Sequence, residues 1–425
     1  MAVPTVTNLL FTHPLLIFGF FLSSAYILAL FLEKFNLPHI LSYLFIGFFY
    51  SNFFFQDIFN DPAYSSEIKL LFHTVEIFAL GLIGFQIGTE LDLKQLMQEP
   101  RKLAILVAGN MIGTFVIVAV VMAFFSFDFI TVLILAALAT STAPAATVGV
   151  IKKLKAKGEV TQKVQWVLAF DDVASVMLVE AILIFALISF GGAATFAEFT
   201  FSLGKEIGLA IVLGFVGGFI LNKLVEKMED PVTKMEISLG ITILVIGISE
   251  FVETSAITAT MMLGATVINL GKNDFIDVQH IIDIIMSPVI AIFFILIGIK
   301  MELSVFSPFP FVALFYFTAR IIGKFVGAYF PARQIGIAEP KRTGFSVSLF
   351  AQGGVVLGLA SIVAEKLESI GKTELGTYIL GLVLISTILS ELVGVIAADW
   401  GIKRSGEAEK IIEKDSLPTA AIHHQ

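Results

Sequence analysis

Long apolar stretches separated by short polar gaps dominate this sequence of 425 residues. About twenty residues of helix rise roughly 30 Å, which is the thickness of the hydrocarbon core of a bilayer. The composition agrees, because 57% of the residues are hydrophobic and only 15% are charged. The pattern therefore predicts an all-α polytopic membrane protein. Its thirteen expected transmembrane helices lie near residues 10–33, 38–54, 67–89, 101–126, 130–152, 160–190, 203–225, 235–251, 254–271, 277–299, 307–331, 342–365 and 375–399.

The basic residues are unevenly distributed over the gaps. Of the 27 Lys and Arg, 20 lie in one set of alternate gaps or in the C-terminal tail, and only five lie in the other set. Because cytoplasmic loops carry the excess of basic residues, this predicts an outer N-terminus and a cytoplasmic C-terminus. We expect one transmembrane domain over residues 1–400 and a short cytoplasmic tail over 401–425.

Short sequence matches recur at an offset of 210 residues. IGTELDL at 87–93 resembles IGIKMEL at 297–303, NMIG at 110–113 resembles RIIG at 320–323, and polar interruptions near 140–147 and 350–356 correspond. The matching helices begin on opposite sides of the membrane, which is typical of the inverted-topology repeats of secondary transporters.

The repeats are expected to span about 10–190 and 235–399, with a linker helix at about 203–225. Ion sites of such transporters lie near the middle of the membrane, where the two repeats meet.

Helix-breaking residues occur at mid-depth in two corresponding spans. Pro removes a backbone donor and Gly weakens a helix, so both spans are expected to be discontinuous and to cross at the centre. Broken helices are tolerated in a bilayer only where protein or a wet cavity satisfies the freed backbone groups. The residues that carry this prediction are Thr140, Ser141, Thr142, Pro144, Gln352, Gly353 and Gly354.

Two adjacent carboxylates, Asp171 and Asp172, lie about eleven residues, or roughly 17 Å, into the span that begins near residue 160. An ionised Asp at the centre of a bilayer costs about 2.5–3.5 kcal/mol on insertion scales, so such residues mark ion or proton pathways. Burial favours the protonated form of a carboxyl group, so a proton and a hard monovalent cation would compete for the same oxygens. Both residues are therefore candidate cation and proton ligands.

A buried base is expected to pair with Asp171. Arg320 lies at the depth of the two Asp residues, and Lys324 lies one helical turn nearer the cytoplasm. Either pair would relieve the cost of two buried charges. Depth favours Arg320, whereas Lys324 is close enough to the interface for its ammonium group to reach water.

The motifs together resemble those of the monovalent cation:proton antiporter superfamily, in particular thirteen-helix bacterial sodium/proton antiporters of the NapA type and their potassium-efflux relatives. The resemblance covers about residues 10–400. Its motifs are NLPHILSYLFIGFF at 36–49, GFQIGTELDL at 84–93, ATSTAPAATVGV at 139–150 and AFDDVASVML at 169–178.

This resemblance implies a NhaA-like fold with two crossed discontinuous helices, a separate dimerisation domain and an elevator-like movement between domains. It implies that Asp172 is the main carrier of cation and proton, that Asp171 pairs with the base, and that Thr140 or Thr142 supplies a hydroxyl group. A lysine partner such as Lys324 would preserve an exchange of two protons per cation, whereas an arginine such as Arg320 cannot release a proton.

We therefore expect a homodimeric antiporter in a bacterial or archaeal plasma membrane that exchanges Na⁺, with Li⁺ as a second candidate, for protons. No enzyme activity, resident cofactor or nucleic-acid partner is expected. Potassium/proton exchange or potassium efflux is the nearest alternative, and a sodium-coupled symporter or a channel is more remote. An intramembrane aspartyl protease is disfavoured, because it needs its two carboxylates on separate helices.

Overall fold

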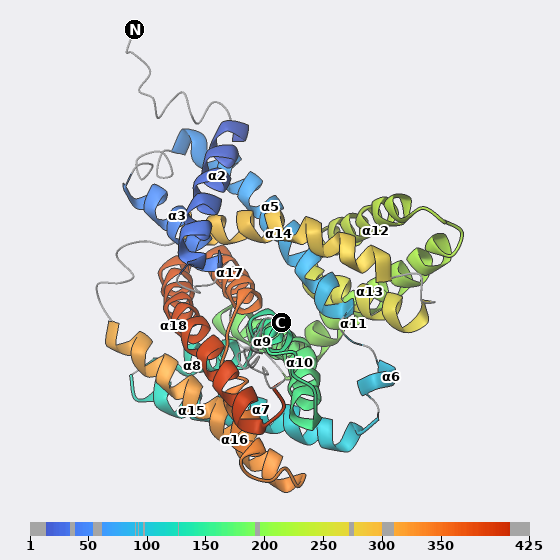
Figure 1. The fold of residues 1–425 in the computed structure, drawn as a ribbon. Coiled ribbons are helices and arrows are strands. Elements are labelled where there is room, and N and C mark those ends of the chain that lie inside the picture. The colour runs from blue at the N-terminus through green and yellow to red at the C-terminus, as the bar shows by residue number, and fades with distance from the viewer. Residues whose placement is uncertain are drawn as a thin grey trace, which may run out of the picture.

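The computed structural model describes residues 14–34, 39–53, 62–89, 91, 93–96, 98–125, 127–191, 196–271, 276–299 and 310–408. Within these ranges all regular secondary structure is helical (Figure 1). The expected tail from residue 409 onward, the first residues of the first expected span and the second half of the motif at 297–303 lie outside the described residues.

The helices lie where the apolar stretches predict them. The first nine are α2 (Pro14–Glu33), α3 (His39–Phe53), α5 (Pro62–Thr89), α6 (Leu93–Leu96), α7 (Pro100–Ala123), α8 (Phe129–Leu138), α9 (Pro144–Lys153), α10 (Glu159–Gly191) and α11 (Phe196–Val225). The others are α12 (Pro231–Phe251), α13 (Ala256–Leu270), α14 (Ile276–Ile299), α15 (Pro310–Gln334), α16 (Lys341–Val347), α17 (Gly354–Ser369) and α18 (Thr373–Ser405). Six helices in the described part of the chain are long and apolar enough to cross a membrane. The all-helical membrane class is confirmed.

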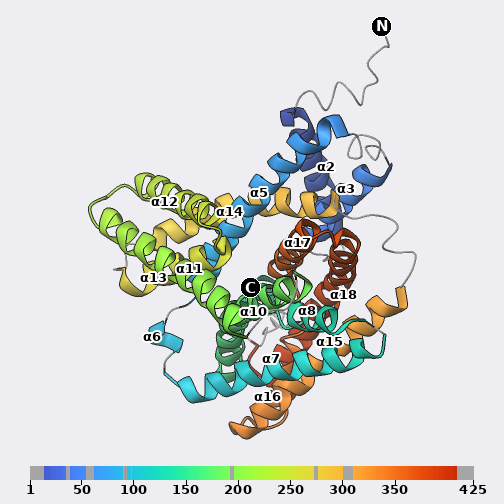
Figure 2. The same ribbon diagram turned by 180° about the vertical axis from the view of Figure 1, so that it is seen from behind.

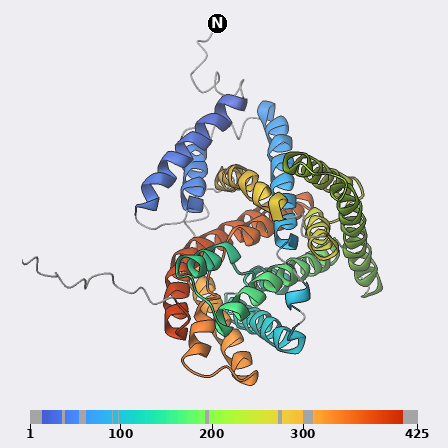
Figure 3. The same cartoon turned by 45° about the vertical axis from the view of Figure 1, so that its right-hand side comes forward.

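The helices form two bundles (Figures 1 and 2). Helices α7 to α10 and α15 to α18 pack on one another, and we call them the site bundle. Helices α2, α3, α5 and α11 to α14 form the flanking bundle. Packing is extensive inside each bundle and sparse between the two bundles. The larger contacts between them are made by α10 and α17 of the site bundle with helices of the flanking bundle. Figure 3 shows the same division from a third side.

Polar contacts between described residues connect the bundles at Glu180 and at His73. Glu180 on α10 accepts hydrogen bonds from the hydroxyl groups of Ser255 and Thr258 at the start of α13, the latter at 3.0 Å. His73 Nδ1 on α5 lies 2.7 Å from Glu365 Oε1 on α17. The helix that bears the Asp pair is therefore attached to the flanking bundle by its own carboxylate.

Glycines let α7 and α15 approach each other closely in the site bundle. A Cβ atom added at Gly113 would lie 2.4 Å from the Cα of Gly327, and one added at Gly327 would lie 2.7 Å from the carbonyl oxygen of Gly109. Neither distance is compatible with a side chain, so the two backbones touch at these positions. This contact brings polar side chains of both helices to the same level.

Candidate functional site

Two helices of the site bundle are interrupted, as the sequence predicts. Helix α8 ends at Leu138 and α9 begins at Pro144, and α16 ends at Val347 and α17 begins at Gly354. Proline suits the first position of a helix, because its missing N–H has no intrahelical partner there.

The two interruptions contact each other. The backbone N–H of Ala143 donates to the carbonyl oxygen of Ala351 at 3.0 Å. The Gln352 amide nitrogen donates to the carbonyl oxygen of Leu138 at 3.2 Å. A Cβ at Gly353 would lie 2.8 Å from the Cβ of Ala143, so glycine is required for this approach. Backbone groups released at one break are thus partly satisfied by the other.

Arg320 on α15 binds both interruptions and is fully buried. Its Nη1 donates to the carbonyl oxygen of Phe350 at 2.7 Å and to Ser390 Oγ at 3.3 Å. Its Nη2 donates to the carbonyl oxygens of Ser141 at 2.8 Å and Ala351 at 3.2 Å. A cation suits the carbonyl ends of α8 and α16, where the helix dipoles are negative.

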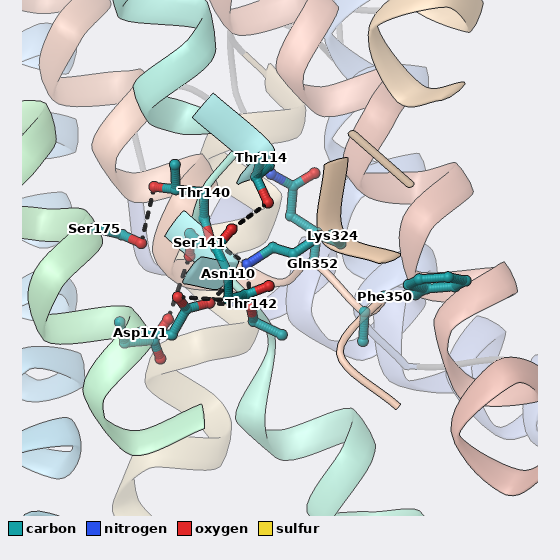
Figure 4. A network of polar contacts seen from close by, with 12 residues as sticks. Asn110, Thr114, Thr140, Ser141, Thr142, Asp171, Ser175, Lys324, Phe350 and Gln352 are labelled. Atoms are coloured by element: carbon teal, nitrogen blue, oxygen red, sulfur yellow. Dashed lines mark hydrogen bonds and ion pairs between the residues drawn. The ribbon is translucent and has the colours of Figure 1, made fainter. Parts of the chain in front are cut away.

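Lys324, one turn further along α15, forms the ion pair with Asp171 (Figure 4). The Nζ–Oδ2 distance is 2.7 Å, and both side chains have zero exposure. The expectation that depth favours Arg320 as the partner is therefore wrong. The guanidinium group is occupied by carbonyl groups at the two breaks, and Lys324 does not extend to the interface because Thr140 and Thr142 also accept from its ammonium group.

Asp171 accepts hydrogen bonds on both carboxylate oxygens. Thr142 donates its hydroxyl group to Oδ2, the oxygen that also binds Lys324. On the other side, Asn110 Nδ2 of α7 donates to Oδ1 at 3.0 Å. Three donors therefore hold Asp171, one from α15, one from the break between α8 and α9 and one from α7.

Asp172 occupies a different environment on the neighbouring face of α10. Its side chain has zero exposure, and Ser141 donates its hydroxyl group to Oδ1 at 3.3 Å. The Thr140 hydroxyl group lies elsewhere, donating to the carbonyl oxygen of Ala137 at 2.7 Å and contacting Ser175 Oγ at 3.1 Å. Of the two threonines expected near the carboxylates, Thr142 thus contacts Asp171, whereas Thr140 contributes its backbone oxygen to Lys324.

Sequence reasoning missed two polar residues of this network, Asn110 and Ser175 (Figure 4). Asn110 corresponds to Arg320 at the offset of 210 residues, so the repeat itself contained a signal. Ser175 lies one turn after Asp171 on the same helix and could have been found by helical spacing alone.

Paired carboxylates, a buried lysine and two interrupted helices in an all-helical membrane protein define an ion transporter of the secondary class. The sequence profile of the family described as "Sodium/hydrogen exchanger, transmembrane" matches residues 20–395. The chain belongs to this family. It is therefore a membrane antiporter that exchanges a monovalent cation for protons, and the expected superfamily is confirmed.

Solved structures agree on the fold. The sodium proton antiporter MjNhaP1 of Methanocaldococcus jannaschii at pH 8 is similar with a TM-score of 0.74 and 18% identity, over 92% of this chain and 98% of that chain. A second structure of the same antiporter, from electron microscopy, gives a TM-score of 0.71 and 17% identity over the same shares. A sequence comparison with curated proteins finds no match. These findings do not favour the potassium alternative.

Proposed function

We propose that the protein exchanges Na⁺, with Li⁺ as a second substrate, for protons, and that Asp172 is the residue where cation and proton compete. The observation that carries this assignment is the division of roles between the two carboxylates. Asp171 is held on both oxygens by Lys324, Thr142 and Asn110. Asp172 lies beside it on the same helix, buried and facing the hydroxyl group of Ser141.

Lys324 is the second proton carrier in this proposal. When a cation binds beside Asp172, it brings positive charge close to the ammonium group, and the two cations repel each other. A buried lysine can respond by releasing its proton, which arginine cannot do. Thr142 and Asn110 still donate to Asp171 after that release.

Alternating access would come from movement of the site bundle against the flanking bundle. The sparse packing between the bundles supports this idea, since few contacts would have to change. We infer thirteen membrane spans, a NhaA-like crossing of the two interrupted helices, an outer N-terminus and a cytoplasmic C-terminus.

The inverted repeat stays part of the proposal, with boundaries of about 10–190 and 235–399 and the linker near 203–225. Helix pairing supports it: α3 packs on α14 and α5 packs on α13, which is the pattern expected when α3 corresponds to α13 and α5 to α14. Helices α7 and α15, which correspond at the 210-residue offset, pack on each other. A homodimer in a bacterial or archaeal plasma membrane rests on the resemblance to dimeric antiporters.

The test is proton flux in liposomes that contain the purified protein, with Na⁺, Li⁺ or K⁺ added in turn and the membrane potential clamped. We expect Na⁺-dependent proton movement that Asp172→Asn abolishes. Asp399→Asn is the matched control, because Asp399 forms a half-exposed pair with Lys403 at 2.6 Å, far along α18. Full exchange in Asp172→Asn would refute the site, and flux driven by K⁺ alone would refute the choice of cation.

A further inference from the structure

The Asn110 side chain is a neutral group of α7 that contacts Asp171. It has zero exposure. It stands where α7 and α15 touch, since a Cβ at Gly327 would lie 3.0 Å from the Asn110 carbonyl oxygen and 3.1 Å from its Cα. A side chain at position 327 would therefore collide with this part of α7.

The orientation of the Asn110 amide follows from its partner. Asp171 Oδ1 is an acceptor, so the NH₂ group must face it, at 3.0 Å. The Asn110 Oδ1 atom then points away from that contact. It is buried and accepts no hydrogen bond from the described residues. An unsatisfied buried acceptor costs about 1–3 kcal/mol, so its presence beside a transport site calls for a ligand.

The two sides of Asp171 differ in charge. Among the described residues, Lys324 Nζ and the Thr142 hydroxyl group approach Oδ2, whereas the Asn110 amide approaches Oδ1. A cation on the Oδ2 side would meet the ammonium group directly. The Oδ1 atom of Asp171 is thus contacted by an amide and not by the ammonium group, and the unsatisfied Asn110 carbonyl oxygen belongs to that same amide.

We propose that Asn110 Oδ1 is a ligand of the transported cation, a role that rests on the proposed antiport at the Asp pair. Hard cations bind carboxylate and amide carbonyl oxygens together. A neutral ligand adds affinity without adding a buried negative charge, so the site does not have to bind another proton when it is empty. The same amide positions Asp171 with its nitrogen and binds the cation with its oxygen.

The experiment compares Asn110→Leu, which has a similar volume and no amide, with Thr114→Val as the matched control. Thr114 lies one turn along α7, is equally buried and donates to the Asn110 backbone oxygen at 2.7 Å. Cation-dependent proton flux in liposomes gives the apparent KM for Na⁺ and the maximal rate. The Na⁺-dependent rise in melting temperature of the detergent-solubilised protein reports binding without transport.

Loss of one ligand to a charged group is expected to raise the apparent KM of Asn110→Leu about tenfold or more, with a much smaller change in maximal rate. The Na⁺-dependent melting shift should weaken in parallel, while Thr114→Val keeps wild-type values. If Asn110→Leu does not fold, Asn110→Ser is measured in the same two assays. An unchanged KM and melting shift would overturn the proposal.

Failure of the inference and failure of the proposed function are distinguishable. If Asp172→Asn abolishes flux but Asn110→Leu binds Na⁺ normally, the antiport site stands and the ligand assignment falls. If Asn110→Leu lowers only the maximal rate, Asn110 acts on Asp171 alone, which also overturns the assignment. If the wild-type protein moves no protons with any monovalent cation, the function itself is refuted.

Discussion

Removal of either member of the Lys324–Asp171 pair should destabilise the protein strongly, and removal of both should cost less than the sum. Lys324→Met leaves Asp171 as a fully buried carboxylate with two neutral donors, Thr142 and Asn110. Asp171→Asn leaves a buried ammonium group with only neutral oxygens. Breaking a buried pair by removing one partner costs about 3–5 kcal/mol, because the other charge stays uncompensated.

The double variant Lys324→Met/Asp171→Asn has no unpaired charge at this place. Its cost should fall below the sum of the single costs by about 2–3 kcal/mol, the coupling free energy of groups in direct contact. At roughly 2 °C per kcal/mol, each single variant should lower the melting temperature by about 6–10 °C, and the double variant by clearly less than the two shifts combined.

Thermal unfolding of the detergent-solubilised protein, followed by the loss of monodisperse material in gel filtration, measures all three variants. Lys403→Met is the control, because Lys403 forms a half-exposed pair with Asp399 at 2.6 Å near the end of α18. A pair that water can reach contributes about 1 kcal/mol or less. The reasoning is refuted if the single effects add to within about 0.5 kcal/mol, or if Lys324→Met costs no more than Lys403→Met.

Two further predictions concern other parts of the fold. Gly113→Ala should separate α7 from α15 and lower the free energy of unfolding by about 1–3 kcal/mol in the same thermal assay. Gly247→Ala on α12 is the control, because a Cβ there has no atom within 4 Å, and it should be neutral or slightly stabilising. Burial opposes ionisation of Glu339 in the α15–α16 turn, but hydrogen bonds from Thr343, Tyr329 and Arg342 outweigh it and lower the pKa of this carboxyl to about 2. Because this folded-state pKa lies below the ordinary value near 4.5, Glu339 stabilises the fold above pH 4.5 and loses that effect as the pH falls toward 2. Glu339→Gln should therefore lower the melting temperature slightly at pH 7 and hardly at pH 2, and an equal loss at both pH values would contradict the pKa.

Much of the architecture was predictable from local sequence. An apolar stretch that crosses lipid satisfies its backbone hydrogen bonds internally when it is helical, so helix positions follow from hydropathy. The breaks at Pro144 and Gly354 were predictable for the same reason, since each residue weakens a helix wherever the chain carries it. Adjacent carboxylates at mid-depth likewise indicated α10 as the helix that bears the candidate site.

The partner of Asp171 was not predictable by the same means. Arg320 and Lys324 are four residues apart and lie on the same face of α15, so depth was the sole sequence criterion that separated them. The choice depends instead on where the carbonyl groups of the two breaks point. Arg320 reaches the carbonyl oxygens of Ser141 and Phe350, which come from segments 209 residues apart. Such a contact exists only once the tertiary fold has formed.

Asn110 shows a related limit. A single Asn in an apolar helix has many uses, and most polar residues of membrane helices bond to neighbouring helices. Its relevance arises from the glycine contact between α7 and α15, which places it opposite Asp171. The match between Asn110 and Arg320 at the 210-residue offset was a usable signal. It indicated where Asn110 lies along its helix, but not that its side chain contacts Asp171.

The assignment of the two bases changes what the site can do electrically. Arg320 is a permanent cation bound to the helix breaks. With Lys324 protonated, two bases balance two carboxylates. A bound cation makes the site positive unless Lys324 releases its proton, which restores the balance. When the site moves back without the cation, with Asp172 and Lys324 both protonated, its net charge is one unit more positive than that of the cation-loaded site with neutral Lys324. In the proposed mechanism, a lysine rather than an arginine at Asp171 would therefore allow the exchange of two protons for one cation, and the membrane potential would contribute to driving the exchange.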